Sequence, residues 1–491
     1  MKLVGKIALG AVVVVALLVA VVLIRTFTWK PPAAVDLSTV TLAQAPAIDQ
    51  ARAAQRLGEA IRFKTISNQD KAANDWAEWD KLHAWLATTY PAAHAAMTRE
   101  ILPNKALVYA WTGSDAALKP IVLMAHQDVV PITPGTEKDW KHAPFGGEIA
   151  EGAVWGRGAI DDKGSLVAIF EGLDALAAGG FKPKRTVIIV SGQDEEVGGT
   201  GAQAAAALLK SRGIKADWVL DEGSAAITEH PITGGPAAII GVAEKGYATL
   251  RITARAPGGH SSAPPKETGV ATLAKAITAI SENQFPLKLS GPGADMVRAL
   301  SGEAGFVMRM ALANEWLFGP LIKAQFAQTP AGAALLHTTI APTMLKGSPK
   351  ENVLPQDATA WINYRIAPGQ TRDDVMARAK AAVKGLNVEL AWESQTASNP
   401  SPVSGTNTDG WRVIAALASD GGKLPVAPGL VGAGTDSRYM TGVSDNIYRY
   451  QPLLASLDTF GMIHGTNERM TLENLSRMTT FYARLVATAA G

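Results

Sequence analysis

The chain has 491 residues, of which 47% are hydrophobic, and its 46 basic and 44 acidic residues leave a net charge of +2. This length and apolar content predict two or more compact units, not a disordered chain. The balanced charge, without a long basic run, argues against a nucleic-acid partner. Cysteine is absent, which excludes disulfides and thiolate chemistry, so any bound metal must be held by histidine and carboxylates.

A long apolar segment opens the chain. Residues 3–24 contain Lys6 as their only charge and are long enough to cross a bilayer as a helix. A cleaved signal peptide is the alternative, but charged and aromatic residues, not small ones, follow the segment. We predict an uncleaved transmembrane anchor over residues 3–24 and a tether over 25–46. Because a short basic N-terminus stays in the cytoplasm, the catalytic part is expected outside it, in the periplasm or an extracellular or lumenal space.

Strand-like and helical segments alternate after the tether. Strands are predicted at residues 120–124, 185–190 and 218–220, with helices at 164–178 and 200–211 between them. This order predicts an α/β fold, in which helices flank a mostly parallel sheet.

The pattern changes near residue 245. Alternating strand-like runs and two helices predict an inserted α+β lid domain with an antiparallel sheet over residues 245–397. The catalytic domain is then expected over residues 47–244 and 398–491. An apolar helical stretch at residues 306–326 lies within the insertion, and we interpret it either as additional core or as a hydrophobic cover over a substrate channel.

Acidic residues and a histidine follow the predicted strands. They lie at 126–128, 161–162, 194–196 and 221–222. Each group alone has an ordinary interpretation, such as a strand-end histidine, a helix cap or a solvated charge run. Adjacent acids at strand ends, however, repel one another unless a cation or a proton neutralises them. Parallel strands end at one edge of a sheet, so a functional site is predicted at that edge.

Six segments in order resemble the motifs of the co-catalytic zinc peptidase and aminoacylase family: HQD, GRGAIDDKG, GQDEEVGG, LDEG, GGHSSAPP and IHGTNER. The resemblance runs from about residue 48 to the C-terminus. It is strongest to the branch of carboxypeptidase S and the N-fatty-acyl-amino-acid synthase/hydrolases, and glutamate carboxypeptidase belongs to the same family. The resemblance implies two bound zinc ions, with cobalt or manganese as substitutes.

Carried onto this chain, the resemblance implies that Asp161 bridges the two metal ions. His126 and Asp221 would complete one ion, and Glu196 and His464 the other. Five ligands for two ions leave open coordination positions, which a catalytic site requires. Aspartate at position 221, where the aminoacylase branch has glutamate, places the chain with the carboxypeptidase-like branch.

The resemblance also implies the roles of the catalytic residues. Glu195 would act as the general base, taking a proton from the hydroxide-forming water between the metals and returning it to the leaving amine. Asp128 would orient the ligand His126. His260, on the lid, would stabilise the oxyanion when the lid closes.

Four residues match positions that hold the substrate carboxylate in the family: Arg365, Asn352, Gly434 and Arg438. A planar guanidinium binds a carboxylate through two hydrogen bonds, so Arg365 is the main candidate. For Arg438 an ordinary salt bridge is the alternative interpretation.

The resulting functional hypothesis is hydrolysis of an amide or peptide bond next to a free carboxylate. A carboxypeptidase acting on small peptides is the leading version. An N-acyl-amino-acid amidohydrolase, for fatty-acyl substrates, is the alternative, and the apolar stretch at 306–326 and the nearby membrane favour it. A catalytically inactive, metal-stabilised binding protein is disfavoured because Glu195 and all five ligand positions are present. The sequence leaves the oligomeric state open.

Overall fold

The computed structural model describes residues 2–31, 37–393 and 397–491. These residues form two compact units. The lid unit comprises Met1–Ala34, Glu229–Gly235 and Tyr247–Asn399, and the catalytic unit comprises Val35–Thr228, Pro236–Gly246 and Pro400–Gly491. Parts of the predicted tether (32–36) and of the predicted lid domain (394–396) lie outside the described residues.

A ten-stranded mixed sheet forms the centre of the catalytic unit, in the order β1-β2-β6-β3-β7-β17-β9-β8-β18 with β16 beside β9. Its middle strands β6 (Val187–Ser191), β3 (Ile121–Met124), β7 (Trp218–Asp221) and β17 (Ile447–Arg449) run parallel. The other strands are β1 (Thr98–Ile101), β2 (Leu107–Trp111), β8 (Ala226–Ile227), β9 (Ala237–Glu244), β16 (Val426–Val431) and β18 (Leu454–Ala455). The predicted mostly parallel sheet with flanking helices is confirmed.

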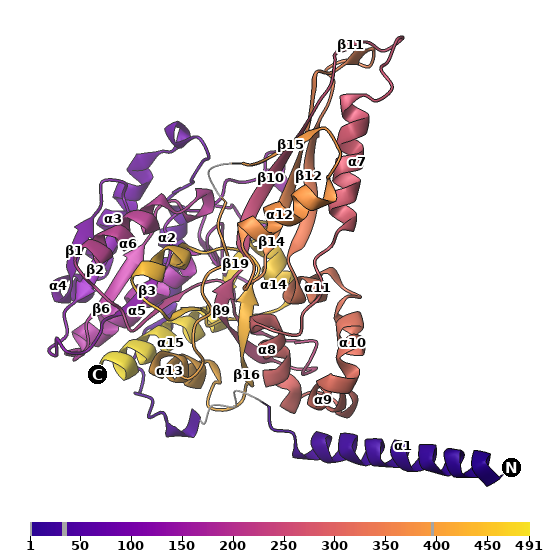
Figure 1. Ribbon diagram of the computed structural model, residues 1–491. Helices are drawn as coiled ribbons and strands as arrows, with labels where there is room; N and C mark the ends of the chain where they lie inside the picture. Colours follow the sequence, from indigo (N-terminus) through magenta and orange to yellow (C-terminus); the bar gives the residue numbers. More distant parts are fainter. Residues whose placement is uncertain (1, 32–36, 394–396) are drawn as a thin grey trace. The chain divides into compact units, whose positions relative to one another are not determined.

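Alternating side chains of the middle strands enter two separate cores. On β3, Ile121 and Leu123 belong to one core, whereas Val122 and Met124 belong to the other. The first core lies under helices of one face, which are α2 (Gln50–Arg62), α3 (Trp76–Thr89), α4 (Pro91–Ala96), α5 (Lys163–Ala178), α13 (Asp409–Ala418) and α15 (Leu472–Ala490). The second core packs α6 (Thr200–Ser211) on the opposite face. These helices cover both faces of the sheet (Figure 1).

A small sheet and a short helix complete the catalytic unit near the C-terminal end of the chain. The sheet has the order β19-β5-β4, formed by Arg469–Thr471, Ala153–Trp155 and Glu148–Ala150. Helix α14 (Leu457–Met462) precedes β19. Because β5 leads toward Asp161 and β19 follows His464, this small sheet ties together two loops that carry predicted site residues.

The lid unit is built on a four-stranded sheet in the order β12-β14-β10-β15. Its strands are β12 (Thr339–Lys346), β14 (Asp357–Ile366), β10 (Gly246–Arg255) and β15 (Val388–Trp392), and the pairs β12–β14 and β10–β15 are antiparallel. Alternate residues of β10 and β14 are buried against α7 (Gly269–Glu282) and α12 (Arg372–Ala382). A two-stranded ribbon, β11 (Gly259–His260) with β13 (Val353–Leu354), extends this unit.

Four helices form an insertion in the lid unit: α8 (Pro292–Ala299), α9 (Phe306–Ala313), α10 (Glu315–Phe326) and α11 (Pro330–Leu336). The single helical stretch expected at 306–326 is therefore two helices. The break falls at Asn314, whose backbone leaves the helical region at φ −126° and ψ 45°. Helix α1 (Lys2–Thr28) also belongs to this unit, and its residues Val4–Thr28 are long and apolar enough to cross a membrane.

Candidate active site

The predicted metal ligands lie on separate loops of the catalytic unit. His126 follows β3, Glu196 lies in the turn after β6, and Asp221 is the last residue of β7. These three strands are parallel neighbours, so their carboxyl ends share one edge of the sheet. Asp161 lies just before α5, and His464 follows α14.

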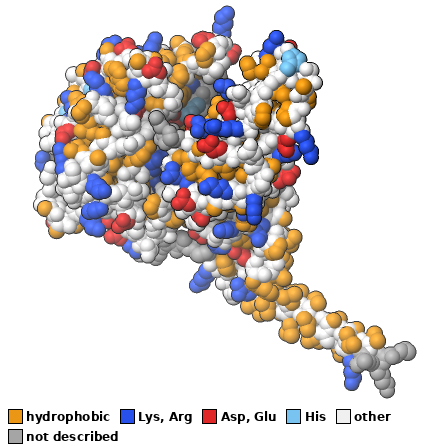
Figure 2. Space-filling model, turned by 45° about the horizontal axis from the view of Figure 1, so that its top comes forward, with side chains coloured by type: hydrophobic (Ala, Val, Ile, Leu, Met, Phe, Trp, Pro, Cys, Tyr) orange, Lys and Arg blue, Asp and Glu red, His pale blue; other side chains and the backbone are white. Residues whose placement is uncertain are grey.

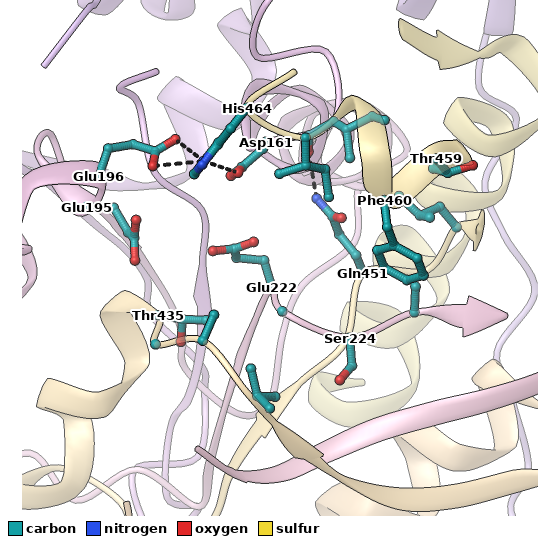
Figure 3. Close-up of a pocket in the computed structure, with 18 residues that line it drawn as sticks. Asp161, Glu195, Glu196, Glu222, Ser224, Thr435, Gln451, Thr459, Phe460 and His464 are labelled. Carbon is teal, nitrogen blue, oxygen red and sulfur yellow. Dashed lines mark hydrogen bonds and ion pairs between the residues drawn. The ribbon is translucent and has the colours of Figure 1, made fainter. Parts of the chain in front are cut away.

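Asp161 lies between two histidines. Its Oδ1 is 2.8 Å from Nε2 of His126, and its Oδ2 is 3.1 Å from Nε2 of His464. The same nitrogen of His464 is 3.0 Å from Oε2 of Glu196 (Figure 3). Ligand atoms of His126, Asp161 and Glu196 all lie within 4.8 Å of one another and could hold a metal ion. Because each oxygen of Asp161 faces a different imidazole, the geometry suits a carboxylate shared between two ions.

The buried carboxylate of Asp128 contacts the backbone of Glu195, the predicted general base, and that of Glu196, a predicted metal ligand. It accepts hydrogen bonds from the backbone N–H groups of Glu195 (3.1 Å) and Glu196 (3.2 Å) and from the Ser67 hydroxyl (2.5 Å). The backbone carbonyl of Asp128 is 3.0 Å from Nδ1 of His126. A carbonyl can only accept, so Nδ1 carries a proton and Nε2 is the atom available to a metal.

Carboxylates crowd this edge of the sheet. Burial raises the pKa of Glu195 well above its ordinary value, and the negative charges of Asp436 and Glu196 add to the shift. Burial also raises the pKa of Glu196, Asp221 and Glu222. A bound cation stabilises such a group by neutralising its charge. The donors are imidazoles and carboxylates, which suits zinc, cobalt or manganese, so the residues present fit a metal centre.

The contacts between the histidines and the carboxylates shift the pKa of Asp161 and the pKa of His464 in opposite directions. Burial alone would raise the pKa of Asp161, but hydrogen bonds from His126 and His464 hold that pKa below its ordinary value. Hydrogen bonds to Asp161 and Glu196 raise the pKa of His464 to about 10. His464 also has a left-handed backbone, with φ 60°, which is uncommon for a residue other than glycine.

Asp221 is a predicted ligand that the structure places outside this group. It is buried, and its Oδ2 accepts a hydrogen bond of 2.8 Å from the backbone N–H of Ser437. Among the described residues, the group whose ligand atoms lie within 4.8 Å of one another is His126, Asp161 and Glu196, without Asp221. Its role as a ligand stays a prediction.

Glu468 holds the loop that carries Asp161, and the sequence analysis did not single it out. This buried carboxylate accepts hydrogen bonds from the backbone N–H groups of Gly158 (3.0 Å), Ile160 (2.9 Å) and Asp161 (3.2 Å). It also forms an ion pair of 2.6 Å with Arg157. Glu468 lies inside the IHGTNER segment, so the motif contained a signal that only the tertiary structure explains.

Asp436 is a second buried acid that the sequence analysis did not select. Within the described part of the chain, neither of its carboxylate oxygens has a hydrogen-bond partner. A Cβ atom at Gly192 or Gly199 would lie 2.0 or 2.3 Å from these oxygens. The glycines that flank the GQDEEVGG acids thus leave room for Asp436, which lies in the same glycine-rich loop as the predicted residues Gly434 and Arg438.

A pocket of about 220 Å³ opens beside the cluster. Asp161, Glu196 and His464 form part of its wall, and the carboxylates of Glu195 and Glu222 turn toward the same space (Figure 3). The apolar part of the wall includes Ile160, Val431, Leu453, Phe460 and Ile463. A pocket of this kind suits a substrate that has a polar reacting bond next to an apolar group.

The predicted carboxylate-binding loop borders this pocket through Gly434. The guanidinium of Arg438 lies against Gly434 so closely that a Cβ atom there would overlap it. Nε of Arg438 donates a hydrogen bond of 2.9 Å to the Thr435 carbonyl and lies 3.6 Å from Oε2 of the buried Glu244. Glu244 is therefore a salt-bridge partner for Arg438. This salt bridge is compatible with the predicted role of Arg438 in binding the substrate carboxylate.

The other three predicted residues belong to the lid unit. His260 is exposed on β11, with Nδ1 2.7 Å from the Ser262 hydroxyl. On β14 the Arg365 guanidinium lies 4.7 Å from the centre of the Tyr247 ring. Oδ1 of Asn352 is buried without a hydrogen-bond partner among the described residues. The approach of these side chains to the catalytic unit stays a prediction.

An α/β sheet edge with a histidine–carboxylate cluster and a partly apolar pocket defines the class of metal-dependent hydrolases. Residues 122–488 match peptidase family M20/M25/M40. The chain is 34% identical to the N-fatty-acyl-amino acid synthase/hydrolase PM20D1 of Xenopus tropicalis, over 99% of this chain and 95% of that protein. It is 33% identical to the probable carboxypeptidase S-like 2 of Dictyostelium discoideum, over 98% of this chain and 93% of that protein.

A solved structure supports the fold. The M20 family metallo-carboxypeptidase Sso-CP2 of Sulfolobus solfataricus superposes with a TM-score of 0.66 at 17% identity, covering 88% of this chain and 98% of that one. The chain belongs to peptidase family M20/M25/M40 and is an enzyme of this metal-dependent hydrolase family. The resemblance drawn from the six sequence segments is thereby confirmed.

Proposed function

We propose that the chain hydrolyses an amide bond next to a free carboxylate, with two zinc ions held around Asp161. The observation that carries this proposal is the position of Asp161, whose two oxygens face His126 and His464 separately. Glu196 and Asp221 would complete the ligand set, and cobalt or manganese would substitute for zinc. Metal ions bound there supply Lewis-acid polarisation of the substrate carbonyl and lower the pKa of a bound water.

Glu195 then transfers the protons of the reaction. It takes a proton from the attacking water and returns it to the leaving nitrogen, and its raised pKa brings it nearer to the range that a general base needs. The two backbone hydrogen bonds to Asp128 keep Glu195 and Glu196 in fixed positions. On closure of the lid, His260 would stabilise the oxyanion.

Substrate recognition is proposed to use both the carboxylate and an apolar group. Arg365 binds the substrate carboxylate through two hydrogen bonds, with Asn352, Gly434 and Arg438 beside it. The leading substrate class is small peptides, as the names of the carboxypeptidase S-like relatives suggest. The second class is N-acyl amino acids, which the apolar pocket wall and the name of the Xenopus relative favour.

We also propose that α1 is retained as a membrane anchor and that the catalytic unit lies outside the cytoplasm. The length and hydropathy of Val4–Thr28 support the anchor. Two basic residues near the start of the chain, Lys2 and Lys6, support this orientation. A carbonate wash that releases the full chain from membranes would contradict the proposed anchor.

The test compares the full chain with its Glu195→Gln variant, each loaded with zinc. Substrates are dipeptides and N-fatty-acyl amino acids that share the same C-terminal residue, each with a free or an amidated carboxylate. We expect turnover of free-carboxylate substrates, and a loss of about 10²–10⁴-fold in kcat for the variant, because glutamine cannot accept the proton.

The substrate panel then separates the two classes. A higher kcat/KM for dipeptides supports the carboxypeptidase version, and a higher value for N-fatty-acyl substrates supports the amidohydrolase version. Equal turnover of amidated and free substrates would contradict recognition of the carboxylate. No turnover of any substrate by the zinc-loaded chain would favour the binding-protein hypothesis.

A further inference from the structure

The lid unit exposes an apolar surface on its inserted helices. We call it the α9–α10 face, and it consists of Phe306 and Val307 on α9 and Trp316, Leu317 and Leu321 on α10. All five side chains are more than one-third exposed, although each is large and apolar. Exposed apolar side chains that gather on neighbouring elements mark an interaction site.

Helix α10 has an orientation that is unusual for a helix in water. Leu317 and Leu321 are four residues apart and therefore lie on one side of the helix, with Trp316 next to them. The buried positions of α10 are Gly319 and Ile322. The helix thus buries a narrow stripe and leaves Trp316, Leu317 and Leu321 exposed, which water disfavours and a lipid interface favours.

The end of α1 packs against the start of this face (Figure 1). The Asn314 amide, between α9 and α10, donates hydrogen bonds of 3.2 Å to the Val22 carbonyl and to the Thr26 hydroxyl. Nε of Arg25 donates a hydrogen bond of 3.2 Å to the Ala313 carbonyl. Val22 and Thr26 are 7% and 1% exposed, whereas hydrophobic side chains along the rest of α1 are open (Figure 2).

Aromatic side chains continue the contact from α1 onto α9. The Phe27 ring lies 6.0 Å from that of Phe306, and the Trp29 indole donates a hydrogen bond of 2.7 Å to the Ser301 hydroxyl. Tryptophan at the end of an apolar helix is typical of the membrane–water interface. The α9–α10 face therefore begins where α1 would leave the lipid.

The contact places the start of α10 beside the end of the apolar run of α1. The apolar run of α1 ends at Ile24, and Arg25 follows it. Val22 lies three residues before Arg25, about 4.5 Å along the helix at 1.5 Å per residue. Asn314 contacts both Val22 and Thr26, so it lies level with Arg25, at the end of the apolar run of α1. Helix α10 begins at the next residue, Glu315.

Two acidic groups near the start of α10, Glu315 and Asp295, are paired with one guanidinium. Oε1 of Glu315 is 2.7 Å from Nε of Arg298, and Oδ1 of Asp295 is 3.0 Å from the same guanidinium. Paired charges approach a bilayer at lower cost than single ones. The polar groups nearest the start of α10 are therefore no obstacle to lipid contact.

We propose that the α9–α10 face is immersed in the interface of the bilayer that α1 crosses, so that the lid unit is held at the lipid surface. The occupant of this face is lipid, not a protein partner. The inference rests on the proposal that α1 is a retained anchor, and it is independent of the reaction that the enzyme catalyses.

The absence of cysteine makes a direct test possible. The full chain is placed in nanodiscs of phosphatidylcholine and phosphatidylglycerol, and single cysteines carry a nitroxide spin label. The variants are Leu321→Cys and Val307→Cys in the face, Val13→Cys in the middle of α1, and Leu345→Cys on β12 as the matched control. Leu321 and Leu345 are 66% and 69% exposed, so they differ in location and not in exposure.

Power saturation measures collisions of each label with oxygen, which concentrates in lipid, and with a water-soluble nickel chelate. We expect labels at Val13, Leu321 and Val307 to collide more with oxygen, and the label at Leu345 to collide more with nickel. Thermal unfolding of each variant verifies that it is folded, and two positions in the face guard against the failure of one.

Three results would overturn the proposal. Nickel collisions at Leu321 and Val307 as frequent as at Leu345, with Val13 in lipid, would show that α1 is an anchor but the face is in water. Low collisions with both reagents would show a protein partner or a second copy on the face. Frequent nickel collisions at Val13, or loss of α1 from the purified chain, would show that α1 is not a retained membrane anchor.

Discussion

Glu468 is the residue whose role in the site is least visible in the sequence. Its carboxylate receives three backbone N–H groups of the loop that presents Asp161, and the Arg157 guanidinium balances its charge. Hydrogen bonds of this kind orient a ligand without touching the metal. The position of Asp161 between His126 and His464 therefore depends on a side chain outside the ligand set.

We predict that Glu468→Gln weakens zinc binding by about 10–100-fold, because glutamine removes the charge and turns an N–H donor toward the backbone donors of the loop. Competition with a chelator of known affinity measures the change. Glu100→Gln, which alters an exposed ion pair with Arg212, is the control and should leave zinc affinity unchanged. Equal affinities for the two variants would contradict the positioning role of Glu468.

Arg365 provides a test of carboxylate recognition. Arg365→Lys keeps the positive charge but loses the two-pronged geometry, and a charged hydrogen bond contributes about 1.5–3 kcal/mol. We expect KM for free-carboxylate substrates to rise by about 10–100-fold, whereas hydrolysis of amidated analogues stays unchanged. Arg251→Lys, at an exposed position on β10, is the matched control. A uniform loss on both kinds of substrate would point to a structural role.

The packing of α5 against α15 is the feature of the elements that most constrains the site. Helix α5 starts directly after the loop of Asp161, and its Gly172 meets the backbone of α15. A Cβ atom at Gly172 would lie 2.9 Å from N and 3.1 Å from Cα of Ala483. The close approach of these two helices holds the first core of the sheet together.

Gly172→Ala should therefore destabilise the catalytic unit by about 1–3 kcal/mol, since the added methyl group forces the helices apart. The midpoint of thermal unfolding of the full chain measures the effect. Gly461→Ala, in helix α14, adds the same methyl group where nothing lies within 4 Å, and it should leave the midpoint unchanged or raise it. A Gly172→Ala chain as stable as the control would exclude this steric argument.

At the scale of the whole molecule, the metal centre couples catalysis to stability. Around the proposed metal centre, six carboxylates have raised pKa values because removal from water disfavours their charge: Asp162, Glu195, Glu196, Asp221, Glu222 and Asp436. Bound cations would relieve this cost in the folded chain and not in the unfolded one. Metal binding is therefore expected to contribute to folding free energy.

Removal of metal with a chelator should abolish hydrolysis and lower the unfolding midpoint, and added zinc should restore both. Binding to the folded state alone contributes about 2.7 kcal/mol per site when the free metal concentration is 100 times its Kd. Calcium is the control ion, because it prefers six to eight oxygen ligands and suits imidazole donors poorly. If the chelated and zinc-loaded chains unfold at the same temperature, the coupling is absent.

The sequence by itself determined the periodic features of this protein. The β-branched run Val187–Val190 and the amphipathic spacing of α6 predicted elements that the structure contains, because these patterns depend on neighbours in the chain. The six motif segments determined the family and nominated His126, Asp161 and Glu196, which the structure brings together. The apolar character of α1 was equally plain from sequence.

Only the tertiary structure decided what depends on residues far apart in the chain. Glu468 lies more than 300 positions from the loop that it holds, and Asp436 fills a space left by Gly192 and Gly199. The break of the apolar stretch at Asn314 accompanies a contact with α1, nearly 300 residues earlier. Local patterns record the preferences of a segment, whereas buried hydrogen bonds and packing at these positions arise when the folded chain brings distant segments into contact.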